Sequence, residues 1–256
     1  MVYYKAVGEI PPKRHTQFRV SESDTAPGTG AFYYEELMGE EGFSSDSSLL
    51  YHRYIPSAML AARPWDITGM ETVPNTTLIP RHLRLHDLFD TADIASVDAV
   101  TGRRLVMGNA DVRILYAVVG AVSPWYRDGI GDECVYVEAG SGRVETIFGV
   151  LEVGEGDYVI IPRATTHRWV PDENTATPLR LYIVEANSHI TPPKRYRSKH
   201  GQLLEHSPYC ERDLRTPAGR LLAEDIGEDP AAPTEVYIKH RGVGNGGIAG
   251  TIHTTP

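Results

Sequence analysis

Gly156-Asp-Tyr-Val-Ile-Ile-Pro162-Arg-Ala164-Thr-Thr-His167 carries the clearest indication of the fold class in this sequence. It begins in a turn, Gly154-Glu-Gly-Asp157, whose glycines tolerate positive φ, and continues into a β-branched and aromatic run typical of a strand. Because side chains alternate between the two faces of a strand, a histidine at this distance can point into a closed barrel from a neighbouring strand. The stretch therefore predicts a β barrel with His167 directed inward.

The same stretch resembles the second metal-binding motif of cupin barrels, Gly-x5-Pro-x-Gly-x2-His, with Ala164 in place of the second glycine. The first cupin motif, His-x-His followed after three or four residues by Glu, is only half present. Glu133 is there, but counting back from it over three residues places Arg127 and Gly129 where the histidines are expected. Neither residue can donate an electron pair to a metal, and Arg127 adds positive charge. We expect Glu133 and His167 to be a vestigial polar pair satisfied by hydrogen bonds.

Strand-like periodicity predicts an all-β protein, a cupin-like jelly-roll barrel with an N-terminal β extension and a C-terminal arm ending in a hairpin. Only Ser57 to Ala62 and Gly219 to Glu224 are helix candidates, and both are short. The expected strands are Val2 to Val7, Phe32 to Leu37, Leu49 to Ile55, Arg103 to Met107, Val112 to Val119, Val135 to Glu138, Val144 to Phe148, Tyr158 to Ile161, Leu179 to Glu185 and Val236 to His240.

The composition changes after Asn187, where Pro192-Pro193 and a polar, proline-containing stretch follow. We expect residues 1–191 to form a β domain that holds the metal-vacant barrel, and residues 192–256 to be a connecting arm and the start of a truncated second half. The last strands, Glu235 to His240 and Ile248 to His253, predict a hairpin around a glycine-rich turn. A hairpin next to a terminus leaves a strand without a second partner.

Charge and cysteine content exclude several classes of protein. The 256 residues carry a net charge of -9, which opposes binding of nucleic acid, and the basic run from Lys194 to His200 is expected to be a solvated loop or subunit contact. Cys134 and Cys210 form no CxxC pair and suit a reducing cytoplasm. Residues 1–15 lack the apolar core of a signal peptide, and no run of eighteen apolar residues predicts a membrane span.

Other polar clusters favour structural roles. His82 and His86 lie four apart without a third ligand at a readable spacing. The serines from Ser44 to Ser48 have no adjacent base and are expected in capped turns. The neighbouring carboxylates Glu35-Glu36 and Glu40-Glu41 are expected to point apart. The strings Tyr51-His52-Arg53 and Lys13-Arg14-His15 fit an anion site or a salt network equally well.

Several strings resemble homogentisate 1,2-dioxygenases, and the likeness extends over essentially the whole chain. They are Val7-Gly-Glu-Ile-Pro-Pro-Lys-Arg-His-Thr-Gln-Phe18, Tyr34-Glu-Glu-Leu-Met-Gly39, Glu41-Gly-Phe-Ser-Ser-Asp-Ser-Ser-Leu-Leu-Tyr-His-Arg53, Gly156-Asp-Tyr-Val-Ile-Ile-Pro162, Thr166-His-Arg-Trp169 and Ser207-Pro-Tyr-Cys-Glu-Arg-Asp213.

The resemblance implies an Fe(II) enzyme of tyrosine and phenylalanine breakdown, which cleaves homogentisate with dioxygen to maleylacetoacetate. It also implies a homo-oligomer, a small aromatic acid as substrate, and no nucleic acid or membrane partner. None of the family's iron ligands has a matching position here, so we identify no catalytic, cofactor-binding or metal-binding residue. Two alternatives stay open: a metal-free cupin scaffold, and a module that binds a small acid at Glu133 and His167 with Arg127 as counter-ion.

Overall fold

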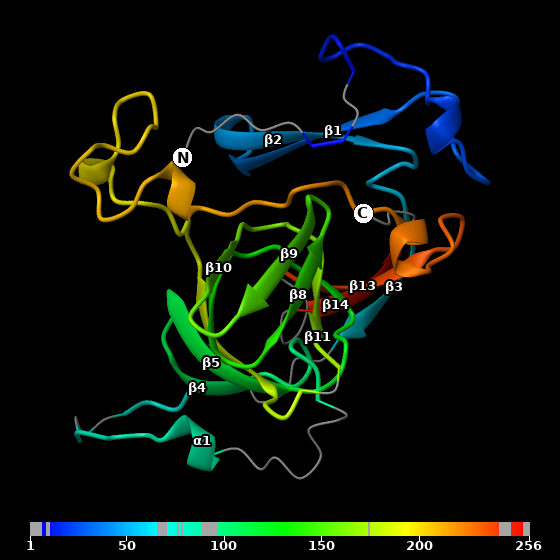
Figure 1. The fold of residues 1–256 in the computed structure, drawn as a ribbon. Helices are drawn as coiled ribbons and strands as arrows, with labels where there is room; N and C mark the ends of the chain where they lie inside the picture. The colour runs from blue at the N-terminus through cyan, green and yellow to red at the C-terminus, as the bar shows by residue number, and fades with distance from the viewer. Residues whose placement is uncertain are drawn as a thin grey trace.

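Two β sheets face each other and form a barrel at the centre of the molecule (Figure 1). The computed structural model describes residues 7–8, 11–65, 71–75, 77, 79–88, 97–173, 175–240 and 247–252. The predicted all-β jelly-roll barrel is confirmed. No helix in these ranges is long and apolar enough to cross a bilayer.

The strands of each sheet come from distant parts of the sequence. Every pairing is antiparallel except that of β13 with β6, which is parallel. The five-stranded sheet has the order β10 (Tyr158–Ile161), β7 (Asp132–Ala139), β12 (Leu179–Ala186), β5 (Val112–Val119) and β4 (Arg104–Gly108). The seven-stranded sheet has the order β3 (Met59–Trp65), β14 (Gly247–Ile252), β13 (Thr234–Lys239), β6 (Trp125–Asp128), β11 (His167–Pro171), β8 (Ser141–Thr146) and β9 (Gly149–Gly154).

The main core fills the space between the two sheets. On β12, Leu179, Leu181 and Ile183 are buried while the residues between them are partly exposed, as the two-residue period of a strand requires. Trp169 of β11 enters the same cluster from the opposite sheet and is fully buried. Fourteen buried residues form this cluster, so the barrel interior is packed along most of its length.

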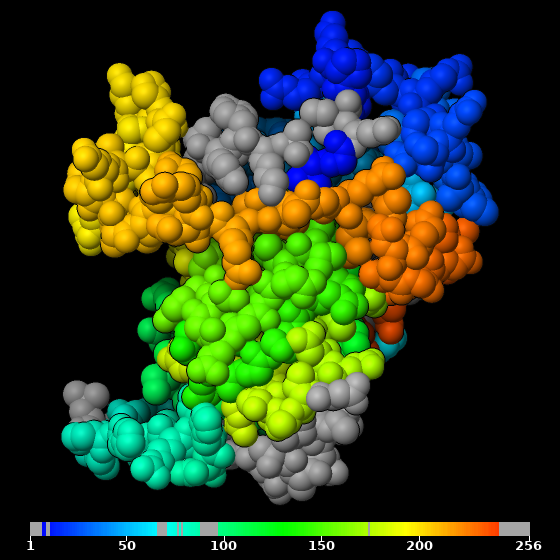
Figure 2. Space-filling view, viewed as in Figure 1, coloured from blue at the N-terminus to red at the C-terminus, as the bar shows by residue number. Residues whose placement is uncertain are grey.

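The N-terminal extension is a separate hairpin above the barrel, formed by β1 (Tyr34–Glu41) and β2 (Ser44–His52) (Figure 1). The serines from Ser44 to Ser48 were expected in capped turns but lie in β2, because the turn falls on Gly42 and Phe43. The arm after residue 210, coloured orange, runs across the barrel beneath the N-terminal segment (Figure 2).

One helix prediction is wrong and the other is only partly correct. Ser57 to Ala62 was expected to be helical, but β3 begins at Met59 and pairs with β14. Gly219 to Glu224 contributes only the start of a short 3-10 turn, Ala223–Ile226. Strands β6, β9 and β11 were not predicted. The remaining short elements are a helical turn α1 (Leu85–Leu88) and 3-10 turns at Glu22–Asp24, Lys194–Tyr196 and Glu211–Asp213.

The C-terminal hairpin extends the barrel. Strands β13 and β14 pair as predicted, and β13 also pairs with β6, so residues on both sides of position 191 share one sheet. The domain boundary at 191 stays a prediction. The glycine-rich turn between β13 and β14 and the expected strand over residues 2–7, except Val7, lie outside the described residues.

Candidate functional site

The residues of β6 that face the barrel interior are Tyr126 and Asp128. Both are buried, and the Tyr126 ring meets the His167 ring edge-on at 5.4 Å between centroids. Arg127 lies on the other face of the strand, where its Nε donates to Thr166 Oγ1 at 2.8 Å. The sequence placed the two cupin histidine positions at Arg127 and Gly129, whereas the residues that face the interior are Tyr126 and Asp128, one position earlier. Four residues separate Asp128 from Glu133, so the longer of the two cupin spacings applies.

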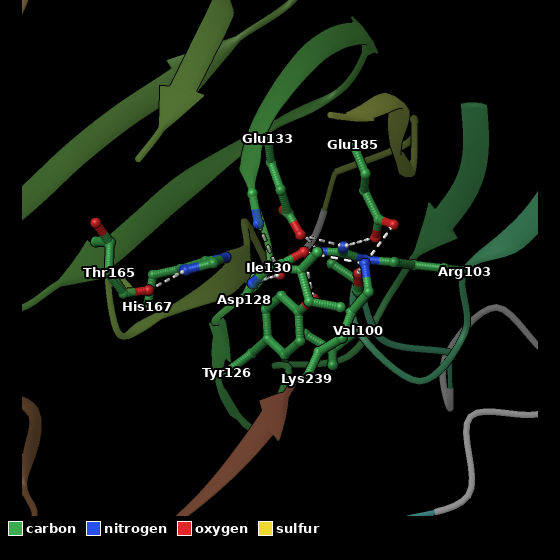
Figure 3. Close-up of polar contacts among 12 residues, drawn as sticks. Val100, Arg103, Tyr126, Asp128, Ile130, Glu133, Thr165, His167, Glu185 and Lys239 are labelled. Atoms are coloured by element: carbon green, nitrogen blue, oxygen red, sulfur yellow. Dashed lines mark hydrogen bonds and ion pairs between the residues drawn. The ribbon is translucent and has the colours of Figure 1, made fainter. Parts of the chain in front are cut away.

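Arg103 fills the centre of the site. Its guanidinium binds both oxygens of Glu133, at 2.6 and 3.1 Å, and one oxygen of Glu185 at 3.0 Å (Figure 3). Its Nε donates to the Ala99 carbonyl at 2.7 Å, and its charge lies 4.9 Å from the centroid of the Tyr126 ring. All of these groups are buried. The Arg103 contacts therefore form a bidentate, charge-assisted pair inside the barrel.

Lys239 supplies a second buried cation. Its Nζ lies 3.0 Å from Asp128 Oδ2 and 2.6 Å from Glu185 Oε2. The Glu185 carboxylate thus bridges Lys239 and Arg103 (Figure 3). Three carboxylates and two protein cations meet in this cluster, which we call the barrel ion cluster: Arg103, Asp128, Glu133, Glu185 and Lys239.

Strand pairing explains why these residues meet. Glu133 of β7 is directly opposite Glu185 of β12, so their side chains project from the same face of one sheet. Lys239 of β13 is the register partner of Asp128 of β6 in the other sheet. Each sheet delivers one pair of side chains to the same end of the barrel, and Arg103, just before β4, closes the group.

The titration of the carboxylates follows from these contacts. Burial alone would raise the pKa of Glu133, but the charge and hydrogen bonds of Arg103 outweigh it and lower that pKa to about 2. Burial raises the pKa of Asp128, and Glu133 and Glu185 add to the increase against the opposing effect of Lys239. Burial would likewise lower the pKa of Lys239, but Glu185 and Asp128 raise it. Both cations are therefore charged at neutral pH.

His167 lies beside the cluster without joining it. Its Nδ1 donates to the Thr165 carbonyl at 3.0 Å, which makes Nε2 the unprotonated nitrogen. Nε2 is buried and has no hydrogen-bond partner in the described part of the chain. Burial lowers the pKa of His167, so the ring is neutral. Glu133 is satisfied by Arg103, and the two vestigial residues are not hydrogen bonded to each other.

A resident iron does not fit the barrel ion cluster. Oxygen atoms of Asp128, Glu133 and Glu185 lie within 4.8 Å of one another, a separation that could suit a cation. Arg103 and Lys239 already bind these oxygens, and a divalent ion there would face two buried positive charges. The cavity that reaches Asp128, Glu185 and Lys239 has a volume of about 10 Å³, room for a single water molecule.

The other candidate clusters have structural partners. His86 Nε2 pairs with Glu138 Oε1 at 2.7 Å and His82 is exposed, and no ligand cluster among the described residues contains either histidine. Glu35 and Glu36 of β1 point apart as expected, since Glu35 accepts from His15 and Glu36 pairs with His52. Glu40 and Glu41 do not follow the prediction, because both approach His189, at 3.9 and 3.6 Å, where the register of β1 is irregular.

The salt-network alternative for Arg53 is supported by its ion pair with Glu224 of the arm at 2.8 Å. Arg53 therefore fastens the segment after the N-terminal hairpin to the C-terminal arm.

Comparisons with known proteins found a curated relative and several solved structures. No family model matches the chain. A "putative dioxygenase" of Saccharolobus solfataricus is 33% identical over 227 residues, which cover 88% of this chain and 54% of that protein, so the chain spans about half the length of this curated relative.

Two of the solved structures that resemble the chain match 40% and 35% of it. A cupin-2 domain protein from Shewanella frigidimarina is 17% identical with a TM-score of 0.32, over 40% of this chain and 87% of that one. KdgF from a Halomonas species is 24% identical with a TM-score of 0.30, over 35% and 83%.

Proposed function

We propose that residues 1–256 form the scaffolding half of an Fe(II)-dependent dioxygenase. The proposed enzyme opens the aromatic ring of homogentisate to give maleylacetoacetate in tyrosine and phenylalanine catabolism. The similarity to the Saccharolobus solfataricus protein supports the dioxygenase class. The strings that resemble homogentisate 1,2-dioxygenases support the substrate. The proposal includes dioxygen and a small aromatic acid as reactants, other copies of the chain as partners, and a cytoplasmic location.

The bidentate contact of Arg103 with Glu133 at 2.6 and 3.1 Å carries the scaffolding role. A metal enzyme needs open coordination positions for its substrate, and a buried guanidinium offers none. In this barrel the protein's own two cations pair with all three carboxylates, so the cluster can stabilise the fold without an ion. Iron would then be held by ligands other than those of the barrel ion cluster.

The small-acid module is less well supported. Arg127 was its expected counter-ion, but Arg127 binds Thr166 on the opposite face of β6 from Asp128. The cavity beside Asp128 holds about one water molecule, whereas ligand pockets are usually hundreds of cubic ångströms. No contact in the described residues favours this alternative over the scaffold.

Two assays test the substrate and the scaffolding role separately. Cells that lack the gene containing this sequence should accumulate homogentisate when fed tyrosine, measured by mass spectrometry of the medium. Accumulation of a different aromatic acid would overturn the substrate assignment. The purified 256-residue chain supplied with ferrous iron and homogentisate should consume no dioxygen above the rate of iron alone. Catalytic uptake with one bound iron per chain would overturn the scaffolding role.

A further inference from the structure

A second group of potential ligands lies outside the barrel ion cluster, between the N-terminal hairpin and the barrel. Glu40 comes from the end of β1, Asp132 is the first residue of β7, and His189 follows β12. One ligand atom of each lies within 4.8 Å of the others. We call Glu40, Asp132 and His189 the hairpin triad.

The distances in the hairpin triad are too long for hydrogen bonds. His189 Nδ1 lies 3.9 Å from Glu40 Oε2 and 3.8 Å from Asp132 Oδ2, whereas direct hydrogen bonds to nitrogen span about 2.7–3.2 Å. Two ligands held about 2.1 Å from one tetrahedral ion lie about 3.4 Å apart. The observed separations are close to that value.

The nitrogen that faces both carboxylates lacks a partner. His189 Nδ1 is buried and makes no hydrogen bond within the described residues. The other ring nitrogen, Nε2, is 3.6 Å from Glu41 Oε1. A buried nitrogen without a hydrogen bond costs free energy, and a metal ion accepting its lone pair would remove that cost.

The Asp132 carboxylate is held in place by the backbone. Its Oδ1 accepts from the Arg163 amide and its Oδ2 accepts from the Ile190 amide, both at 2.8 Å. Each carboxylate oxygen has a second lone pair that these amides leave available. Hydrogen bonds of this kind orient ligands in metal sites.

Negative charge accumulates around His189. Three carboxylates, those of Glu40, Glu41 and Asp132, lie 3.9, 3.6 and 3.8 Å from the ring nitrogens of His189. Arg163 donates to the Glu40 backbone carbonyl, and no ion pair among the described residues joins a lysine or arginine to the Glu40 carboxylate. A divalent cation would relieve this repulsion.

We propose that Glu40, Asp132 and His189 bind a divalent first-row transition-metal ion that fastens the N-terminal hairpin to the barrel. One imidazole and two carboxylates form a donor set that such ions accept, with water completing the coordination. This site is independent of the barrel ion cluster and of the proposed reaction.

Metal titration of the tag-free, EDTA-treated 256-residue chain tests the proposal. Cobalt(II) should give visible absorption bands that saturate at one ion per chain, and zinc should displace it. His189→Gln should weaken zinc binding by at least about tenfold, the scale of loss seen for perturbed metal shells, and Glu40→Gln should weaken it as well. His86→Gln, which alters an exposed histidine paired with Glu138, should bind as the wild type does.

Hydrogen exchange gives a second readout, which depends on zinc binding at the hairpin triad. Zinc should slow exchange of the β1 and β2 amides in the wild type and in His86→Gln, but not in His189→Gln. Absence of one-to-one binding in the wild type would overturn the proposal. Binding that survives His189→Gln and Glu40→Gln unchanged would overturn it too.

Discussion

At the scale of single residues, the barrel shows how protein cations can take the place of an ion. Glu133 and His167 were identified from sequence because the cupin motif fixes their spacing. Arg103, Glu185 and Lys239 were missed, since they lie 30, 52 and 106 residues from Glu133 and carry no local pattern. The one-residue error at Arg127 arose because the cupin spacing allows three or four residues, and only strand register distinguishes the two.

Removing the guanidinium should destabilise the fold. Arg103→Met leaves Glu133 buried without its ion-pair partner and Glu185 paired with Lys239 alone, and breaking a buried pair in this way costs about 3–5 kcal/mol. Urea unfolding measures the loss. Arg104→Met, at the exposed neighbouring position, should change the unfolding free energy by less than about 0.5 kcal/mol. Equal effects of the two substitutions would contradict the role assigned to Arg103.

Acidification should weaken the cluster through Glu133. Its pKa falls from 4.5 to about 2 in the folded protein, so its contribution is fully present above pH 4.5 and is lost as the pH falls toward 2. Asp128, whose pKa is raised, acts in the opposite sense. Urea unfolding at several pH values should show that the unfolding free energy of Glu133→Gln depends less steeply on pH over this range than that of the wild type. Parallel profiles would contradict the assignment.

Ala164 occupies a position that favours glycine. Its φ is 67°, in the left-handed region, and its amide donates to the Asp128 carbonyl at 2.7 Å. Ala164→Gly should raise the unfolding free energy by about 0.5–1 kcal/mol, because relief of strain exceeds the added freedom of the unfolded chain.

The control for Ala164→Gly is Ala61→Gly in the exposed strand β3. This substitution should lower the unfolding free energy by about 0.5–1 kcal/mol. Both values come from thermal or urea unfolding. Losses of the same sign at both positions would argue against strain at Ala164.

At the scale of elements, strand pairing decided where sequence patterns were ambiguous. Met59-Leu-Ala-Ala favours a helix by propensity, yet these residues form β3 because backbone pairing with β14 outweighs the local preference. The longer strands β5 and β12 were predicted nearly to their ends, since their apolar pattern is long. Short strands such as β6 were missed because four residues give little periodicity.

The turn between β6 and β7 fixes the register that aims Asp128 and Glu133 into the barrel. A Cβ added at Gly131 would lie 1.6 Å from the Ala186 carbonyl oxygen and 3.0 Å from the Asn187 Cα, and these backbone atoms cannot turn aside as the end of a flexible side chain could. Gly131→Ala should therefore cost more than about 2 kcal/mol in urea unfolding.

Gly154→Ala is the matched control for Gly131→Ala, because a Cβ at Gly154 would meet no atom within 4 Å. Its effect should be small. A comparable loss at both glycines would show that close packing at Gly131 does not determine the register.

At the scale of the whole molecule, the barrel ion cluster joins segments far apart in the chain. Arg103 precedes β4, whereas Lys239 ends β13, and the two cations meet through the Glu185 carboxylate. The barrel can therefore close and give each of these buried carboxylates a protein cation as partner without a metal. The fold class followed from the sequence, but the charge balance of the interior depends on three-dimensional proximity that no motif encodes.

The claim that the barrel ion cluster holds no iron can be tested by anomalous diffraction at the iron absorption edge. The crystals would contain the 256-residue chain and be soaked in ferrous iron under anaerobic conditions. We predict no anomalous peak among Asp128, Glu133 and Glu185, with the Arg103 and Lys239 side chains in density at their carboxylate partners. A peak within coordination distance of these three carboxylates, with either cation displaced, would contradict the account.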